Sequence, residues 1–345
     1  CQMRTGGRTF QWRPVFTHPK IAPAEQRMIT GNRYDLMDTH TTDDTRSRLS
    51  RPPGIFNIEL TNRCPMRCVM CPRTRHMTRK QGMMDVALFE KIADELISVN
   101  PDYRSGRLVW LHHFGESLLH PEFDRCIIYA RGRGLDTGLS INPFMLKGDV
   151  PARLLNSAPR VLYVSLDGHD EESFFRIRGM RDGYELSRRR LLEFLKMKTA
   201  MRSQVRIILS MIDFSLNAES LCLTREFWES LEGVDAFLPK TFTAWDGSCD
   251  DINAMAEGSG REDLSGPITC RFPFDTMTVL WNGDVVPCCF DFNGRYVLGN
   301  AGAQSLTEIW NAAPMIELRK EFLADDVANR LCSKCPNLRK PFGAL

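Results

Sequence analysis

The sequence predicts an α/β fold, a partial TIM-like (β/α)6 barrel followed by a small cysteine-bearing domain. Two observations lead to this prediction. Residues 55–248 alternate between short apolar segments and longer amphipathic ones, the pattern of parallel strands covered by helices. Six strands are too few for a closed eight-stranded barrel, so we expect a barrel that is open on one side. The remaining C-terminal residues show a hairpin signal and clustered cysteines instead.

Hydrophobic periodicity gives the elements of the barrel. The expected strands are, in order, Ile55–Leu60, Arg107–His112, Asp136–Ile141, Val161–Leu166, Val205–Ile212 and Ala236–Leu238. The expected helices are Met84–Ser98, Glu122–Arg131, Gly148–Ser157, Gly183–Met201 and Ala218–Leu231. Together they predict a parallel sheet with helices on its outside.

Two regions flank the barrel. Residues 1–54 form an N-terminal extension, which is basic, has little apolar periodicity and ends at a Pro-Pro-Gly turn. Residues 249–345 form the C-terminal domain, in which Asn282 and Gly283 mark the turn of a hairpin. Its polar first part is expected to be a loop, and its expected helices are Ser305–Asn311 and Met315–Leu323.

Composition and charge exclude several classes of protein. The chain has 345 residues, and 43% of them are hydrophobic, which rules out wholesale disorder. Its net charge of +2 gives no reason to expect nucleic-acid binding. It has neither an apolar run that would span a membrane nor a secretory signal, so we expect a cytoplasmic protein without a membrane partner.

The 12 cysteines are too clustered for a set of disulfide staples. Cys64, Cys68 and Cys71 place three thiols within eight residues, directly after the first expected strand. Zinc is the alternative ligand, but zinc sites usually join two two-cysteine knuckles. Three closely spaced thiolates favour a [4Fe–4S] cluster with one iron left open for a ligand that is not protein.

Four motifs, each after an expected strand, carry a resemblance to a known family. They are CPMRCVMC at residues 64–71, FGESLLHP at 114–121, INP at 141–143, and SLDG at 165–168 with IRG at 177–179. This combination resembles the radical S-adenosylmethionine (SAM) superfamily, in its SPASM/twitch subgroup. Two residues depart from the family pattern, because Met70 replaces an aromatic residue that packs on adenine and Phe114 replaces the first glycine of GGE.

The C-terminal cysteines resemble the shorter, twitch form of the SPASM domain. That resemblance implies a second [4Fe–4S] cluster, with spacing similar to that of a radical SAM aminocyclitol dehydrogenase. Its implied ligands are Cys270, Cys288, Cys332 and Cys335. Cys289 is expected to be packed, because adjacent cysteines seldom both reach one cluster.

The resemblance also implies how SAM is bound. Gly115 and Glu116 would hold the amino group of its methionine part, since a carboxylate accepts charge-assisted bonds from an ammonium. Asn142 and Ser165 would reach the ribose or the carboxylate, and Arg178 would pair with the carboxylate unless it is a surface charge. Met70 would contact the adenine.

We expect an oxidoreductase that abstracts hydrogen from a small polar metabolite of the aminocyclitol, sugar or nucleoside type, as in natural-product biosynthesis. The auxiliary cluster would accept one electron of a two-electron oxidation, and a flavodoxin or ferredoxin would reduce the SAM cluster. Modification of a ribosomal peptide and radical epimerisation are the alternatives. The candidates for acid–base or hydrogen-donor chemistry are His112, His113 and Cys249, and either histidine is alternatively a core imidazole.

Overall fold

The computed structural model describes residues 49, 51–104, 107–256 and 266–339. The predicted N-terminal extension therefore lies outside the described residues, apart from its last few positions. Six strands follow one another in the order that the sequence predicts. They are β1 (Ile55–Ile58), β2 (Leu108–Trp110), β3 (Asp136–Ile141), β4 (Val161–Ser165), β5 (Arg206–Asp213) and β6 (Ala236–Thr241).

These strands form one parallel sheet in the order β6-β5-β4-β3-β2-β1. Because all six run in the same direction, the loops that leave their carboxyl ends meet at one edge of the sheet. The prediction of an α/β fold with a partial, open barrel is confirmed.

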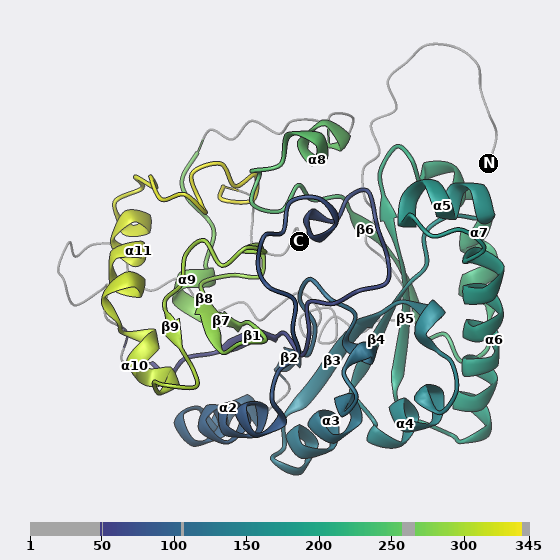
Figure 1. Ribbon diagram of the computed structural model, residues 1–345, viewed down its shortest axis with the longest axis horizontal. Coiled ribbons are helices and arrows are strands. Elements are labelled where there is room, and N and C mark those ends of the chain that lie inside the picture. Colours follow the sequence, from purple (N-terminus) through teal and green to yellow (C-terminus); the bar gives the residue numbers. More distant parts are fainter. Residues whose placement is uncertain (1–48, 50, 105–106, 257–265, 340–345) are drawn as a thin grey trace.

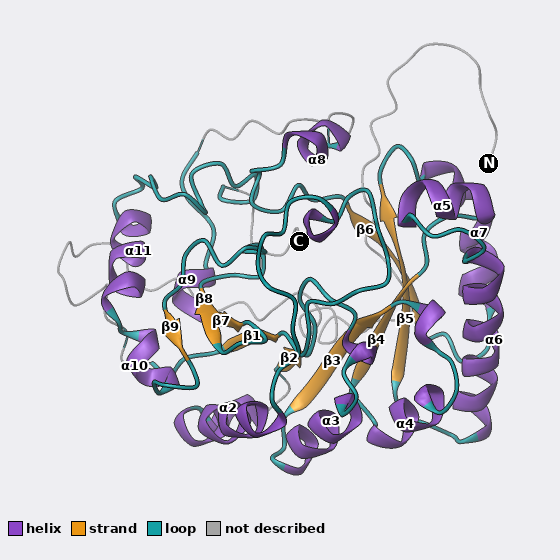
Figure 2. Cartoon of the chain, viewed as in Figure 1, coloured by secondary structure: helices purple, strands orange, loops and turns teal. Residues whose placement is uncertain are grey.

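Helices cover the outside of the strands, as Figure 2 shows. The sequence predicts five of them to within a few residues. They are α2 (Val86–Val99), α3 (Phe123–Gly132), α4 (Val150–Ser157), α6 (Tyr184–Ala200) and α7 (Ala218–Ser230). The prediction missed α5 (Glu171–Arg178), whose capping box joins Asp170 and Ser173, and the short helices α8 (Asp250–Met255) and α9 (Phe272–Asp275).

The strands separate two apolar regions, because alternate side chains point to opposite faces. Leu162 and Val164 of β4 pack in the large core beneath the helices. Tyr163, between them, belongs to a smaller cluster on the inner face of the barrel. The other buried members of this inner cluster are Leu108, Trp110, Val161, Ile208 and Ala236.

The C-terminal part extends the same sheet. Strand β7 (Met277–Val279) pairs in parallel with β1, and β8 (Asp284–Val286) and β9 (Gly299–Asn300) continue the sheet in antiparallel fashion. The helices α10 (Leu306–Trp310) and α11 (Ala313–Leu323) cover it, at the left of Figure 1. The predicted hairpin and both predicted helices are present.

No helix in the described ranges is both long enough and apolar enough to cross a membrane.

Candidate functional site

The loop after β1 carries Cys64, Cys68 and Cys71, all with free thiols. In Figure 1 this dark segment runs between the barrel strands and the C-terminal part. The end of α5 supports it, because the backbone N–H groups of Arg67 and Val69 donate to the carbonyls of Arg178 (3.0 Å) and Ile177 (3.0 Å). We call residues 61–72 the cluster loop.

Burial raises the pKa of Cys64 and of Cys71 to about 12. A thiolate in this setting needs a nearby positive charge. A bound metal ion supplies that charge and thereby favours deprotonation of its thiol ligands. Within the described ranges no three His, Cys, Asp or Glu side chains converge as a single metal ion requires. Three thiols spaced along one loop suit an iron–sulfur cluster, because each thiolate binds a different iron.

Gly115 and Glu116 lie directly against the cluster loop. A Cβ atom on Gly115 would lie 1.9 Å from the carbonyl oxygen of Thr61, so only glycine fits there. The N–H of Glu116 donates to the carbonyl of Arg63 (2.8 Å), and its carboxylate accepts from the N–H groups of Leu118 (3.2 Å) and Asn142 (2.8 Å). The motifs after β2 and β3 are thus brought to the cysteines.

Arg178 also lies at the cluster loop, so it is not a surface charge. Its Nη1 donates to the Sγ of Cys68 (3.6 Å), and its Nη2 forms an ion pair of 2.6 Å with Asp167. Asp167 is fully buried and is oriented by the N–H of Ile212 and the amide of Asn217, each at 2.8 Å.

Two buried donors at this edge lack partners within the described part of the chain, namely the Nδ2 atom of Asn142 and the Nε atom of Arg178. Unsatisfied buried donors are costly and rare, so each suits an acceptor on a ligand. The carboxylate and the ribose of SAM offer such acceptors.

Ser165 belongs to a row of serines across the inner face of the barrel. Its Oγ lies 3.4 Å from that of Ser140 on β3 and 3.3 Å from that of Ser210 on β5. Next to this row, the Nδ1 atom of His112 accepts the N–H of Ser140 at 3.0 Å. Burial and the charge of Lys240 lower the pKa of His112 to about 3, so the imidazole is neutral and carries its proton on Nε2.

His113 points away from this inner face. Its Nε2 lies 2.7 Å from the carbonyl oxygen of Cys289, and its Nδ1 lies 3.3 Å from the buried carboxylate of Glu59. Arg79 binds the same carboxylate through two contacts of 2.8 Å. These contacts make His113 a structural link between β1 and the C-terminal cysteines.

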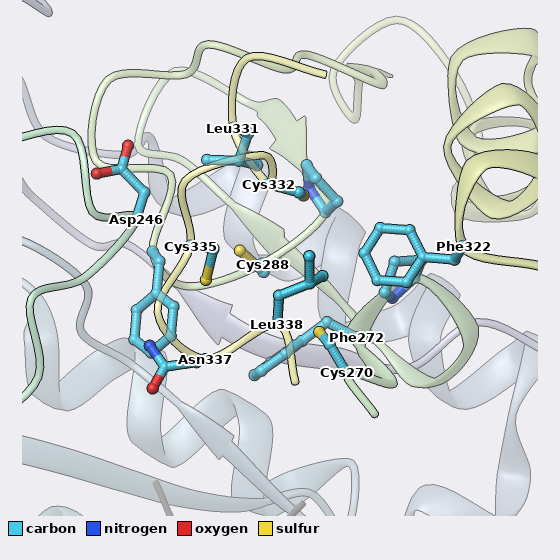
Figure 3. Close-up of a pocket in the computed structure, with 13 residues that line it drawn as sticks. Asp246, Cys270, Phe272, Cys288, Phe322, Leu331, Cys332, Cys335, Asn337 and Leu338 are labelled. Carbon is cyan, nitrogen blue, oxygen red and sulfur yellow. The ribbon is translucent and has the colours of Figure 1, made fainter. Parts of the chain in front are cut away.

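A pocket in the C-terminal part is lined by Cys270, Cys288, Cys332 and Cys335. Figure 3 shows the four side chains around one space, beside Phe272, Asn337 and Leu338. All four thiols are free. Four cysteines around an otherwise mainly apolar pocket are the donor set that a fully ligated iron–sulfur cluster requires.

Local turns hold these cysteines in place. The side-chain oxygen of Asn329 accepts from the N–H of Cys332 (2.9 Å), and the N–H of Cys270 donates to the carbonyl of Leu338 (3.1 Å). Gly247 packs so tightly on the knuckle formed by Cys332 and Cys335 that a Cβ atom there would lie 2.0 Å from the carbonyl oxygen of Lys334.

Two further cysteines near the C-terminal site, Cys249 and Cys289, lie outside this lining. Cys289 is not among the residues that surround the pocket. Cys249 is the N-cap of α8 and is 5% exposed, and its Sγ lies 3.7 Å from the Oγ of Ser248.

Comparison with known proteins identifies two domains. Residues 58–219 match the description "Radical SAM superfamily", and residues 270–336 match "SPASM: Iron-sulfur cluster-binding domain". The chain therefore contains a radical SAM domain followed by a SPASM domain. The first match contains the cluster loop, and the second contains all four cysteines of the pocket.

Two curated relatives illustrate how far the likeness extends. The chain is 22% identical over 306 residues to the S-adenosyl-L-methionine-dependent 2-deoxy-scyllo-inosamine dehydrogenase of Niallia circulans, covering 83% of this chain and 93% of that protein. It is 29% identical over 110 residues to the tungsten-containing aldehyde ferredoxin oxidoreductase cofactor-modifying protein of Pyrococcus furiosus. This second match covers 32% of the chain and only 30% of the relative.

Solved structures show the same fold. BtrN in complex with AdoMet and 2-DOIA has a TM-score of 0.54 at 17% identity, covering 83% of this chain and 94% of that one. Streptococcus suis SuiB bound to the precursor peptide SuiA has a TM-score of 0.60 at 16% identity, covering 86% and 72%. The radical SAM domain implies that the protein uses SAM and a [4Fe–4S] cluster, and the SPASM domain implies further iron–sulfur binding.

Sequence reasoning missed two residues of this radical SAM site. Trp245 has a left-handed backbone (φ = 58°), which is strained for a bulky side chain. Its indole N–H donates to the carbonyl of Met70 (2.8 Å), and its own carbonyl lies 3.9 Å from the Sγ of Cys335, so it joins the two cysteine sites. No sequence pattern signalled this contact.

Lys240 is the second missed residue. It lies on β6 with its Nζ 4.1 Å from the centroid of the Tyr163 ring, on the inner face of the barrel. The alternation of Ala236, Leu238 and Lys240 along one strand was a usable signal, because residues two apart share a face.

Proposed function

We propose that this enzyme oxidises a small polar metabolite by two electrons and that the auxiliary cluster accepts one of them. The observation that carries the proposal is the pocket lined by Cys270, Cys288, Cys332 and Cys335. Four thiolates complete the coordination of a [4Fe–4S] cluster, so none of its irons is open to substrate. Electron transfer is the chemistry that such a closed cluster supports.

In this proposal Cys64, Cys68 and Cys71 would hold the other cluster, and its iron without a protein ligand would be available to SAM. When bound, these groups supply a 5′-deoxyadenosyl radical that takes a hydrogen atom from the substrate. The backbone of Gly115 permits close approach, and Glu116 receives the SAM amino group. Three further residues face the rest of SAM, namely Asn142, Ser165 and Arg178. Met70, which is 3% exposed, provides the apolar contact for adenine.

The oxidation balances in atoms and electrons. The substrate would lose one hydrogen atom to the adenosyl radical, one proton to water and one electron to the auxiliary cluster. His112 cannot take that proton readily, since its Nδ1 already accepts the Ser140 N–H and its Nε2 carries hydrogen. We assign His112 the role of a hydrogen-bond donor to the substrate oxygen. The electron that starts the reaction comes from an external reductant of the flavodoxin or ferredoxin type.

Iron analysis and SAM cleavage test the cluster assignment. The reconstituted enzyme should contain about eight iron atoms per chain and cleave SAM under reduction. Replacing Cys64, Cys68 and Cys71 together by alanine should leave about four irons and abolish cleavage. Cys126→Ala is the control, because Cys126 is a buried free cysteine that lies in α3, away from both sites. Cleavage that survives the triple replacement would refute the proposal.

Product analysis tests the type of reaction. A two-electron oxidation consumes one SAM per turnover and gives a product two mass units lighter than its substrate. A product of unchanged mass that has gained solvent deuterium would instead establish epimerisation. A modified peptide product would overturn the choice of a small metabolite.

A further inference from the structure

Lys240 is a cation on the inner face of the barrel, and the described residues provide no anionic partner for it. It occupies the penultimate position of β6, at the edge where the cluster loop leaves β1. Its ammonium lies over the ring of Tyr163, 4.1 Å from the centroid. Across the described ranges, no carboxylate, carbonyl or hydroxyl group is within hydrogen-bonding distance of its Nζ.

The other charged groups around Lys240 are already neutralised. Asp167 is the carboxylate that acts on it electrostatically, but Asp167 is paired with Arg178 at 2.6 Å and accepts two further hydrogen bonds. The imidazole of His112 is neutral and therefore provides no negative charge to pair with Lys240. Among the residues that the structure describes, the charge of Lys240 therefore has no paired anion on the inner face.

The aromatic side chains next to Lys240 do not fully compensate its charge. Trp110 stacks on Tyr163 with centroids 5.1 Å apart and an angle of 8°, so the ammonium faces an aromatic surface. A cation–π contact compensates only part of the cost of removing an ammonium from water. Burial accordingly lowers the pKa of Lys240 to about 8, which still leaves it mostly protonated near neutral pH.

We propose that Lys240 binds an anionic group of the substrate, a carboxylate or a phosphate. This inference rests on the proposed function, since it assumes that the substrate enters the inner face of the barrel. Lys240 supplies the charge that selects it.

This assignment separates the enzyme from its dehydrogenase relative in Niallia circulans, whose name specifies an inosamine. An amine is protonated at neutral pH, and an ammonium close to the ammonium of Lys240 would be repelled. The inner face therefore suits an acidic sugar or a sugar phosphate better than an aminocyclitol.

The carboxylate of SAM is a second possible source of the anion. Arg178 is better placed to bind it, because its guanidinium contacts Cys68 and has an unbonded Nε. Lys240 belongs instead to the aromatic group on the inner face. The affinity for SAM distinguishes the two sources.

The test uses the SAM-loaded holoenzyme and three probes with the same ring, which are glucuronate, glucosamine and glucose. Isothermal titration calorimetry under anaerobic conditions measures the affinity of each. We expect glucuronate to bind at least tenfold more tightly than glucose, and glucosamine to bind most weakly. Equal affinities, or a preference for glucosamine, would overturn the inference without any variant.

Two variants locate the effect. Lys240→Met removes the charge at similar length and should abolish the preference for glucuronate, whereas Lys240→Arg should retain it. If the preference survives in Lys240→Met, or if that variant instead loses tenfold or more in SAM affinity, Lys240 does not bind the substrate anion. SAM cleavage by the reduced wild-type enzyme is measured in parallel. Failure of cleavage would refute the proposed function, whereas cleavage without anion preference would refute only the inference on Lys240.

Discussion

Glu116 shows how a single side chain is prepared for a ligand. Burial raises the pKa of its carboxyl group to about 7, although the N–H groups of Asn142 and Leu118 oppose the shift. Burial makes the ionised form of this carboxyl group unfavourable, and a bound cation would stabilise it. In the proposed site that cation is the amino group of SAM.

The affinity for SAM should therefore depend on pH. Below pH 7 the carboxyl group of Glu116 is protonated and must lose its proton when SAM binds, so we expect the affinity to fall by about tenfold between pH 8 and pH 6. Calorimetric titration with SAM at pH 6, 7 and 8 measures this change. Glu116→Gln cannot ionise and shows only the contribution of the SAM amino group. Identical profiles for the two proteins would contradict the role of Glu116.

Two neighbouring histidines show what the sequence could and could not predict at this scale. His112 ends the expected strand Arg107–His112, and His113 follows it directly. The sequence left both as candidates for acid–base chemistry. Choosing between them required the contacts of each, namely Ser140 for His112 and Glu59 and Cys289 for His113.

At the scale of elements, both cysteine sites depend on loops that approach each other too closely for any side chain. Gly115 lies against the cluster loop, and Gly247 lies against the knuckle of Cys332 and Cys335. The motif around Gly115 was recognisable in the sequence. Gly247 was not, because the polar segment that contains it contacts residues far along the chain.

Alanine at each glycine should damage one site and spare the other. Gly247→Ala, which also strains a backbone at φ = 74°, should reduce the iron content from about eight to about four per chain and leave SAM cleavage in place. Gly115→Ala should keep about eight irons but lose SAM binding. Gly132→Ala is the control, since nothing lies within 4 Å of its Cβ position. Loss of both functions in either variant would show that the two sites are not separable.

At the scale of the whole molecule, a single sheet connects the two cysteine sites. The sequence correctly predicted the barrel strands and the C-terminal hairpin as separate patterns. It gave no sign that β7 pairs in parallel with β1, since this pairing joins segments separated by the whole barrel. Long-range pairing of this kind leaves no local pattern in composition or periodicity.

A fragment that ends at residue 248, the predicted domain boundary, should therefore fail to fold. The fragment lacks β7, which pairs with β1 in the full-length chain. Met277 and Val279 of β7 are fully buried in that chain. The fragment also loses the bonds of Lys91 to the carbonyl of Ala301 (2.6 Å) and of the Trp310 indole to the carbonyl of Arg51 (3.1 Å).

An edge strand with an unpaired backbone and exposed apolar side chains promotes aggregation. We expect the fragment to be largely insoluble and to show no cooperative unfolding in urea. The full-length chain should be soluble and should unfold cooperatively. A soluble fragment with about four irons and SAM binding would show that the barrel is an independent domain.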